Sequence, residues 1–283
     1  MRIPGTYAAA LRAARAGAAV APHALPGATA VVRANLRLAF GRADPLLVRS
    51  IYRHFAQAAV DILWFDRLFD ARNPERHLEL AGPGWEHFAR TRPHGAVVVT
   101  GHFGNWEIYG ASFRHVGIPM AAVARRPNAA WFANRLDRFR ARLGMETIEK
   151  DNALPLAMKA LRAGKCVAFL NDQAAGRFGV PAPFFGRPVS TFTAPAALAL
   201  KLGVPLYAGY SSRTGDGIRY RCWAEPVSVE GDAVAVTARL NAVLEGYVRA
   251  RPEQWWWFHR RFKPRRMERQ GRPVSAAGVP IAS

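Results

Sequence analysis

The amino-acid sequence predicts an α/β fold, in which a central mixed, largely parallel sheet is flanked by helices and preceded by a helical N-terminal section. The segments 96–100 and 165–170 are short and almost wholly apolar, which is typical of strands buried on both faces of a parallel sheet. From about residue 90 onward such segments alternate with stretches of helical periodicity, the order that places helices against a sheet.

The helical N-terminal section is predicted from two segments. Residues 28–40 repeat their apolar positions with helical spacing. A stronger helix begins after Asp44, a favourable N-cap, with Pro45 in its first position. Its apolar residues recur every three or four positions: Leu47, Ile51, Phe55, Ala58, Ile62, Phe65 and Phe69.

The elements after residue 90 follow from the same two patterns. Strands are expected at 96–100, 120–124, 165–170, 204–211 and 218–224. Helices are expected from 106, over 131–143, from a cap at Asp151 or Asn152 to Gly164, over 193–202 and over 237–249. Gly164 and Gly203 end two of these helices, since glycine is the residue most at ease in the left-handed conformation that follows a helix.

Length and composition exclude several classes of protein. With 283 residues, of which 50% are hydrophobic and 11% aromatic, the chain can bury a large core and is not intrinsically disordered. Because no window of about 18 residues is free of charges and helix breakers, no transmembrane helix is expected. We expect a monomer with one domain over 28–265, a poorly ordered or amphipathic segment over 1–27, and a basic, flexible tail over 266–283.

Charge is the unusual property of the composition. Lys and Arg number 40 against 20 Asp and Glu, a net charge of +20, and nearly all of the basic residues are Arg. A bias toward Arg codons explains this excess as well as a function does, but either way the protein is attracted to polyanions such as an anionic membrane, an acidic carrier or nucleic acid. An Arg-rich nucleic-acid-binding protein is the alternative from another functional class. We expect no nucleic-acid partner, because no helix-turn-helix, RNP-like or zinc pattern is present.

The segment 101–107 (GHFGNWE) carries the residues of a candidate catalytic site. It follows the strand at 96–100 and opens a helix, and the carboxyl ends of strands are where open α/β sheets bind ligands. A carboxylate one helical turn away, Glu107, can hold the His102 imidazole in one tautomer. With no Ser or Cys nucleophile beside it, this pair suggests general-base activation of a hydroxyl. The alternative is an ordinary strand-to-helix turn; the spacing does not suit zinc, and no metal is expected.

Four blocks in the same order resemble the late acyltransferases of lipid A biosynthesis (lauroyl/myristoyl acyltransferase-like), within the His-x4-Asp/Glu glycerolipid acyltransferase superfamily. They are His-Phe-Gly-Asn-Trp-Glu at 102–107, Asn-Asp-Gln at 171–173 with Val-Pro-Ala-Pro-Phe-Phe-Gly at 180–186, Thr-Ala-Pro-Ala-Ala-Leu-Ala at 193–199, and the signature at 252–263. The resemblance spans about residues 30–265. It implies transfer of a fatty acyl group from an acyl carrier protein or coenzyme A thioester to a hydroxyl of a membrane glycolipid, with no other cofactor. The acceptor is a lipid A precursor or another polar lipid, such as a phosphatidylinositol mannoside.

The resemblance also implies roles for individual residues. His102 would be the general base, and Glu107 would orient it. Further substrate contacts are expected from Gly104, Asn105, Arg125, Arg126, Arg142, Asp172, Gln173, Phe184, Phe185 and Gly186. The first two supply backbone N–H groups at a helix N-terminus, where an oxyanion can be stabilised. Arg142 lies near the position where the family tends to keep an active-site Arg, while Asp172 and Gln173 either bind the acceptor or fix their loop.

Typical family members begin with a membrane-spanning segment, and none is expected in this sequence. Attachment to the membrane is therefore expected to be peripheral, at the cytoplasmic face of the inner membrane. Two features are compatible with such attachment. Tyr7 and Leu11, with Arg2, Arg12 and Arg15, suggest a weakly amphipathic helix on the bilayer. The aromatic run 255–258 either anchors at the membrane interface or packs against the sheet, and the sequence leaves both open.

Overall fold

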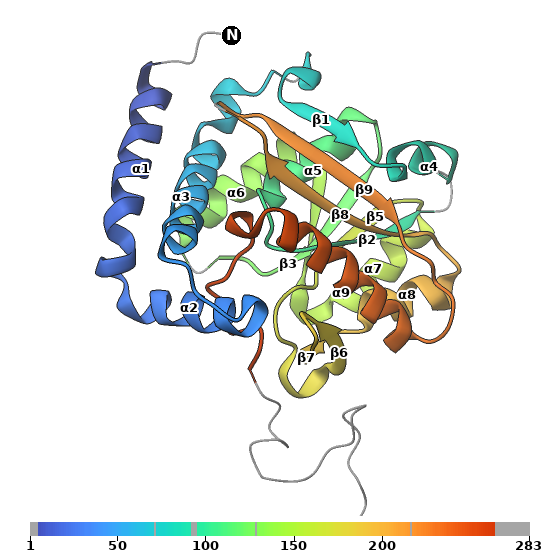
Figure 1. The fold of residues 1–283 in the computed structure, drawn as a ribbon. Coiled ribbons are helices and arrows are strands. Elements are labelled where there is room, and N and C mark those ends of the chain that lie inside the picture. Colours follow the sequence, from blue (N-terminus) through green and yellow to red (C-terminus); the bar gives the residue numbers. More distant parts are fainter. Residues whose placement is uncertain (1–4, 71, 92–94, 128, 216, 264–283) are drawn as a thin grey trace, which may run out of the picture.

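The computed structural model describes residues 5–70, 72–91, 95–127, 129–215 and 217–263. The tail expected over 266–283 lies outside these residues, as do the first four residues of the segment 1–27. The described chain has a central sheet with helices on both faces; at one end α1 and α3 lie side by side, and α2 crosses beneath them (Figure 1). The predicted α/β class is confirmed.

The central sheet has seven strands in the order β1-β9-β8-β2-β5-β3-β4. They are β1 (Leu78–Ala81), β2 (Ala96–Thr100), β3 (Met120–Ala124), β4 (Met145–Glu149), β5 (Cys166–Leu170), β8 (Leu206–Arg213) and β9 (Tyr220–Pro226). Neighbouring strands are parallel except at the β8–β9 pair, so the sheet is mixed and largely parallel, as predicted. A separate antiparallel hairpin is formed by β6 (Val180–Phe184) and β7 (Arg187–Thr191).

Nine α-helices are found in the described residues, and they pack around two apolar cores, with α1 and α3 contributing to both. They are α1 (Gly5–Ala24), α2 (Pro26–Phe40), α3 (Pro45–Leu68), α4 (Gly84–Thr91), α5 (Trp106–His115), α6 (Ala130–Arg142), α7 (Ala153–Arg162), α8 (Ala194–Leu202) and α9 (Ala233–Ala250). Along β2, Val97 and Val99 join the core under α7, α8 and α9, whereas Val98 joins the core under α4, α5 and α6. Burial on both faces explains why this strand is apolar up to Thr100.

The predicted caps of the helices near the site are confirmed. The Asp44 carboxylate accepts a hydrogen bond from the N–H of Leu46 at 2.9 Å, with Pro45 opening α3. The Asn105 side chain accepts from the N–H of Ile108 at 3.2 Å and begins α5. This second cap fixes the point at which the chain turns from β2 into α5.

The N-terminal segment is a helix whose apolar side is buried in the protein. Tyr7 and Leu11 of α1 are 0% and 5% exposed, and the Tyr7 hydroxyl donates to Asp61 of α3 at 2.5 Å. These two side chains therefore pack inward and do not face a bilayer. Arg12 and Arg15 are exposed on the same helix.

Candidate active site

His102 and Asp172 meet because their strands are neighbours. Strands β2 and β5 pair in register, with Thr100 opposite Leu170, and each residue lies two positions beyond the end of its strand. The Asp172 carboxylate binds His102 twice: Oδ2 accepts from the backbone N–H at 2.8 Å, and Oδ1 lies 2.8 Å from the ring Nδ1. A pair at the carboxyl edge of a parallel sheet is well placed to meet a ligand.

The Asp172 carboxylate is buried but ionised. Only 2% of its surface is exposed, and Oδ2 also accepts from the indole N–H of Trp255 at 2.9 Å. Burial by itself would raise the pKa of this carboxyl. The charge of His102 and the hydrogen bonds from His102 and Trp255 outweigh burial and lower the pKa to about 2.

His102 is held in the tautomer that a general base requires. Because Asp172 is ionised, the proton of the neutral ring lies on Nδ1, and Nε2 remains the basic nitrogen. Burial lowers the pKa of His102, but the charge and hydrogen bond of Asp172, with a contribution from Glu107, raise it above its ordinary value. The side chain is 20% exposed, and its ring meets Trp106 edge-on at 4.7 Å between centroids.

The hydrogen bond expected between Glu107 and His102 is not formed. Glu107 instead makes a bidentate ion pair with Arg140 of α6, with Nε and Nη2 at 2.9 and 2.6 Å from its two oxygens. Both side chains are 7% exposed. Burial lowers the pKa of Arg140, but the Glu107 carboxylate more than reverses this and raises it. The acid that orients the imidazole is therefore Asp172, and Glu107 acts on His102 only through its charge.

A cavity of about 610 Å³ opens beside His102. Its walls are mainly apolar, from α3, α5, β3, α6, α7, β5 and the start of α8, and include Ile62, Trp106, Val123, Leu136, Leu154, Phe169 and Phe192. Three cations, Arg125, Arg140 and Lys150, also line it, as do Asn171 and Gln173. An apolar cavity with a few polar groups at one end is suited to a ligand with a long apolar part.

The two backbone N–H groups expected to stabilise an oxyanion are engaged within the protein. Gly104 N–H donates to the Gln254 carbonyl at 2.8 Å, and Asn105 N–H donates to the Ser211 hydroxyl at 3.2 Å. Gly104 serves the turn itself: its φ is +61°, and a Cβ there would collide with the Ser211 carbonyl oxygen. In this arrangement neither N–H group is free to bind an oxyanion.

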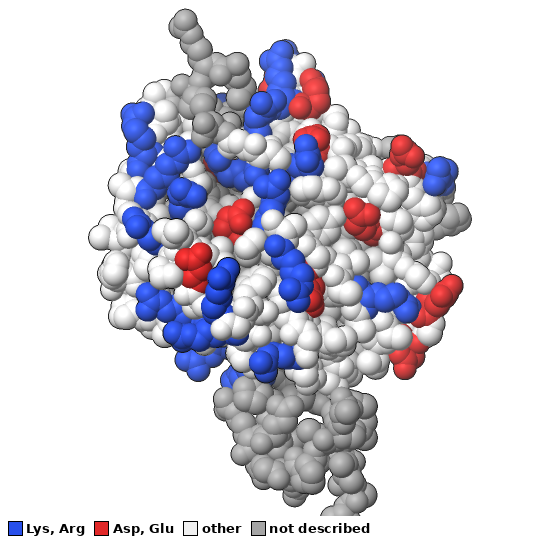
Figure 2. All heavy atoms as spheres, viewed as in Figure 1, with Lys and Arg blue, Asp and Glu red and all other residues white. Residues whose placement is uncertain are grey.

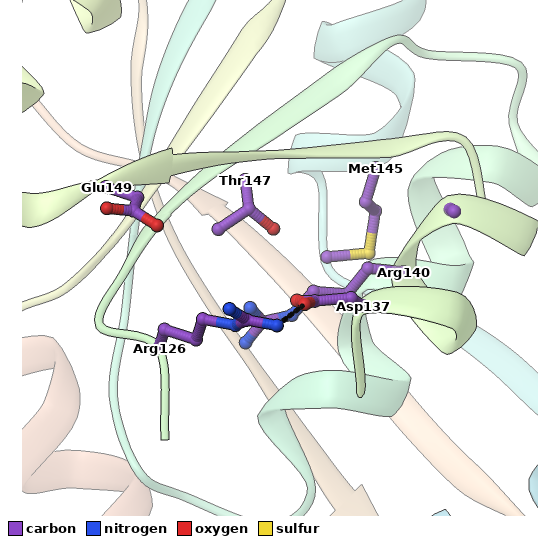
Figure 3. A pocket seen from close by; sticks show the side chains of 7 residues that line it. Arg126, Asp137, Arg140, Met145, Thr147 and Glu149 are labelled. Atoms are coloured by element: carbon purple, nitrogen blue, oxygen red, sulfur yellow. Dashed lines mark ion pairs between the residues drawn. The ribbon is translucent and has the colours of Figure 1, made fainter. Parts of the chain in front are cut away.

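The arginines expected at the site are divided among different places. Arg125 lines the main cavity, whereas Arg126 points into a second cavity of about 360 Å³ between α6 and β4 and pairs with Asp137 at 3.4 Å (Figure 3). Arg142 is exposed and is not among the residues that line either of these cavities. The arginine of α6 that lines both is Arg140.

The two phenylalanines of the Phe-Phe-Gly block are buried and Gly186 is exposed, and none of the three lines the cavity beside His102. Phe185 and Gly186 are the two turn residues of the β6–β7 hairpin, with φ of 51° and 68°, as a type I′ turn requires. Phe184 and Phe185 are 0% and 6% exposed and pack against Phe262. These residues support the fold, and the described cavity beside His102 is lined by others.

The aromatic run 255–258 packs mainly into the protein. Trp255 and Trp257 are 1% and 0% exposed and meet each other edge-on at 4.6 Å. Trp256 is half-buried against Phe55. Packing thus explains Trp255 and Trp257. Trp255 also donates a hydrogen bond to Asp172, a role that its sequence context did not indicate.

The sequence contained partial signals for the residues whose roles were missed. Asp172 follows a strand end, as does His102, and parallel neighbours bring such positions together. Nothing in the sequence distinguishes Arg140 from the other arginines of its helix. Among the described residues, no group of three His, Cys, Asp or Glu side chains is arranged to hold a metal ion, and none of the helices has the length and apolarity needed to cross a membrane.

Three curated relatives share part of the sequence. The lipid A biosynthesis palmitoleoyltransferase of Escherichia coli K12 is 32% identical over 184 residues, covering 62% of this chain and 58% of the relative. The phosphatidylinositol mannoside acyltransferase of Mycolicibacterium smegmatis is 26% identical over 165 residues, covering 57% of this chain and 54% of the relative. The E. coli K12 lipid A biosynthesis lauroyltransferase is 34% identical over 113 residues, covering 38% of this chain and 37% of the relative. Each match covers less than two thirds of the relative's own length.

A family match covers nearly the whole of the described fold. The family of bacterial lipid A biosynthesis acyltransferases matches residues 6–264, which begin in the first turn of α1 and include Trp255, the C-terminal residue that bonds Asp172. The match includes the His102 motif, the Asp172 loop and every helix and strand between them. With this span and the geometry of His102 and Asp172, the chain belongs to the bacterial lipid A biosynthesis acyltransferase family.

Proposed function

We propose that this protein is an O-acyltransferase that moves a fatty acyl group from a thioester to a hydroxyl of a membrane glycolipid. The observation that carries the proposal is the His102–Asp172 pair at the wall of an apolar cavity. A basic nitrogen held in a fixed tautomer can take a proton from an alcohol, and an apolar cavity can hold a fatty chain.

The reaction proceeds in two steps. Nε2 of His102 takes the proton of the acceptor hydroxyl while the hydroxyl oxygen attacks the thioester carbonyl carbon. Asp172 stabilises the imidazolium that forms. The tetrahedral intermediate then breaks its carbon–sulfur bond, and the thiolate leaves as the free thiol after taking the proton from His102. Acyl ester and thiol are the products, and no acyl-enzyme is needed.

The other residues of the cavity supply binding and charge. Arg125, Arg140 and Lys150 are the cations that line it, and they can stabilise the oxyanion or a substrate phosphate. Glu107 holds Arg140 in place through their bidentate pair. The apolar side chains that line the cavity, among them Ile62 and Phe192, hold the acyl chain.

The donor is an acyl carrier protein or coenzyme A thioester, and the acceptor is a lipid A precursor or another polar lipid. The named relatives include transferases of both kinds of lipid, acting on lipid A and on phosphatidylinositol mannosides. The enzyme would act as a monomer, bound peripherally at the cytoplasmic face of the inner membrane. The basic outer side of α1, α2 and α3 supports this placement, because anionic lipids attract exposed Arg.

The experiment is acyl transfer by the purified protein in mixed micelles, with each donor tested against each acceptor. The product is identified by mass spectrometry, and the lipids of cells with and without the protein identify the native acceptor. His102→Gln should lower the rate at least about a hundredfold, the usual contribution of a general base. The matched control is His115→Gln, a change at an exposed histidine on α5. Full activity of His102→Gln, or no transfer by the wild type with any pair, would contradict the proposal.

A further inference from the structure

The C-terminal segment Gln254–Arg261 bonds both loops that carry the His102–Asp172 pair. Toward the first loop, the Trp256 N–H donates to the His102 carbonyl at 2.9 Å, and Gln254 accepts from Gly104. Toward the second loop, His259 Nε2 accepts from the Ala174 N–H at 2.9 Å. Arg261 then donates from Nη1 to the Gln173 carbonyl at 3.0 Å, one residue beyond Asp172.

Arg261 is a cation in an unusual setting. It is 0% exposed, and its guanidinium donates to the Ser190 carbonyl at 2.8 Å and the Thr191 hydroxyl at 2.8 Å, with a longer contact to Asn241 at 3.3 Å. All of these acceptors are neutral, and Nε has no hydrogen-bond partner among the described residues. Burial of a cation without a bonded carboxylate is unfavourable. Packing alone therefore does not explain why Arg261 is buried at this position.

The charge of Asp172 affects the pKa of Arg261. Burial lowers the pKa of Arg261 to about 10, and the charge of Asp172 acts against this shift. Because opposite charges attract each other, the positive charge of Arg261 also favours the ionised form of Asp172, although His102 and Trp255 are the main causes of its lowered pKa.

Asp172 is fixed on both sides along the chain. On one side, Asn171 bonds Thr100 through its N–H at 3.0 Å and Phe192 through its side chain at 2.9 Å. On the other side, the Gln173 carbonyl is held by Arg261. A carboxylate oxygen can keep a 2.8 Å hydrogen bond to an imidazole only if its backbone does not drift.

We infer that Arg261 is a positioning residue for the acyl transfer proposed above, one that fixes the Asp172–Gln173 loop and thereby the orientation of His102. The inference rests on that proposed function for its kinetic consequence only. Its structural consequence, a fixed Asp172–His102 hydrogen bond, exists without substrate. Arg261 itself touches neither the cavity beside His102 nor the ring of His102 in the described contacts.

The test compares Arg261→Met with Thr191→Val in the full-length protein. Arg261→Met keeps the length of the side chain but removes the contact with Gln173. Thr191→Val removes a hydroxyl at the end of β7, in the hairpin, that accepts from Arg261 and from Asn241 of α9, and it leaves the Gln173 contact in place. It is therefore the control for stabilisation of the hairpin alone. Arg261→Lys, which keeps a charge and a donor, is the second variant in case the first does not fold.

The first readout is the pKa of His102, measured by NMR titration of its imidazole without substrate and assigned by the signal that His102→Gln lacks. The ionisable groups that act on this ring are Asp172, Glu107 and, on the C-terminal segment, His259. With Asp172 no longer fixed, the pKa should fall toward the value of about 6.5 of a free imidazole in Arg261→Met, and partway in Arg261→Lys. Thr191→Val should leave it unchanged, although the melting temperature falls.

The second readout is the kinetics of acyl transfer. Arg261→Met should lower kcat about tenfold and leave KM for the acyl donor unchanged, since only the base is misplaced. A rise in the His102 pKa would show simple loss of a repelling charge and would overturn the inference, as would equal effects of Thr191→Val. If the wild type transfers no acyl group, the proposed function fails, but the titration still decides the positioning role.

Discussion

The Asp172 carboxylate accepts three hydrogen bonds, two from His102 and one from Trp255, from residues that are far apart in the sequence. The hydrogen bond to the backbone N–H fixes the position of the His102 main chain, and the hydrogen bond to the ring fixes its tautomer. The hydrogen bond from the indole of Trp255 favours the ionised form of the buried carboxylate. Each of these bonds depends on the same two oxygens. A change at Asp172 therefore affects the position, tautomer and basicity of His102 together.

Asp172→Asn should remove most of the activity while keeping the shape of the site. The amide can present its NH₂ to Nδ1, which favours the wrong tautomer, and it lacks the charge that stabilises the imidazolium. We expect kcat to fall by about 10²- to 10⁴-fold. Transfer rates are compared at equal folded fraction, judged by circular dichroism. An Asp172→Asn enzyme within a factor of three of the wild type would exclude Asp172 as the orienting acid.

The raised pKa of His102 predicts how activity and stability depend on pH. His102 is a base only when neutral, so the acidic limb of kcat/KM should lie above about pH 6.5 and move to lower pH in Asp172→Asn. A group with a raised folded pKa contributes stability below its unfolded pKa, and this stability is lost as the pH rises through the folded value. The free energy of unfolding in urea, measured from about pH 5 to 9, should therefore fall for the wild type relative to His102→Gln as the pH rises. Parallel pH curves for the two proteins would contradict a raised pKa.

Glu107 should matter first for folding, because it neutralises buried Arg140. Breaking a buried ion pair by removing one partner costs about 3–5 kcal/mol, whereas replacing both partners with apolar residues is close to neutral. Glu107→Gln should thus lower the free energy of unfolding strongly, and Glu107→Leu with Arg140→Met should recover much of the loss. Denaturant unfolding of the single and double variants measures this coupling. Additive losses would mean that the two side chains do not act as a pair.

At the scale of elements, helix α1 is held by a buried polar cluster. Asp61 of α3 is 0% exposed and accepts from the hydroxyls of Tyr7 and Tyr220 at 2.5 Å and from Nε of Arg213 at 3.0 Å. Burial raises the pKa of Asp61, and the charge of Arg213 with the three hydrogen bonds opposes that rise. The cluster therefore connects α1, α3, β8 and β9 through one carboxylate.

Tyr7→Phe should loosen α1 without opening the rest of the molecule. Loss of a hydrogen bond to a charged group costs about 1.5–3 kcal/mol, and amide exchange in α1 should become faster while exchange in β2 and β5 stays the same. The control is Tyr52→Phe, which removes a buried hydroxyl bonded to Thr29 of α2 at 2.9 Å. That control should leave exchange in the first half of α1 unchanged. Equal acceleration in both variants would mean that the Asp61 cluster does not anchor the helix.

The elements that the sequence predicted well are those with a strong apolar pattern or a cap. The strand at 96–100 agrees residue for residue with β2, and the helix after Asp44 agrees with α3. Strands β1 and β4 were not predicted, because they are the two edges of the sheet, and β4 reads Met-Glu-Thr-Ile-Glu with polar residues that face solvent. The β6–β7 hairpin was expected only as a loop, since its turn uses Phe185 at positive φ, where Gly or Asn is usual.

The candidate site was predicted in part for a similar reason. A local motif finds His102, because the motif lies within one turn of chain. The partner of His102 depends on which strands are neighbours, and no short-range pattern encodes that β5 lies beside β2. Glu107 is close in sequence, but it faces α6 and its Arg140. Sequence proximity therefore identified His102, the proposed general base, and missed Asp172, the acid that bonds its ring.

At the scale of the whole molecule, positive charge is concentrated on the N-terminal helices. Residues 5–60 contain seven Arg and one Asp, with no Lys or Glu, and all seven Arg are exposed. On the face shown in Figure 2, Lys and Arg gather over α1, α2 and α3. Val20, Leu25 and Leu46 are 62%, 52% and 70% exposed on the same section. A basic surface that also exposes apolar side chains is suited to the headgroup region of an anionic bilayer.

Charge reversal on this surface should weaken binding to membranes. Each basic residue near an anionic surface contributes about 1 kcal/mol, so loss of two predicts about thirtyfold weaker binding, and reversal predicts more. The variant is Arg33→Glu with Arg37→Glu, on α2, and the matched control is Arg90→Glu with Arg162→Glu, on α4 and α7, which changes net charge equally. Binding is measured by sedimentation with vesicles of phosphatidylglycerol and phosphatidylethanolamine. The wild type should also bind less tightly as salt rises, because the Debye length falls to about 10 Å at 0.1 M. If the control pair weakens binding as much as the α2 pair, total charge and not this surface governs attachment.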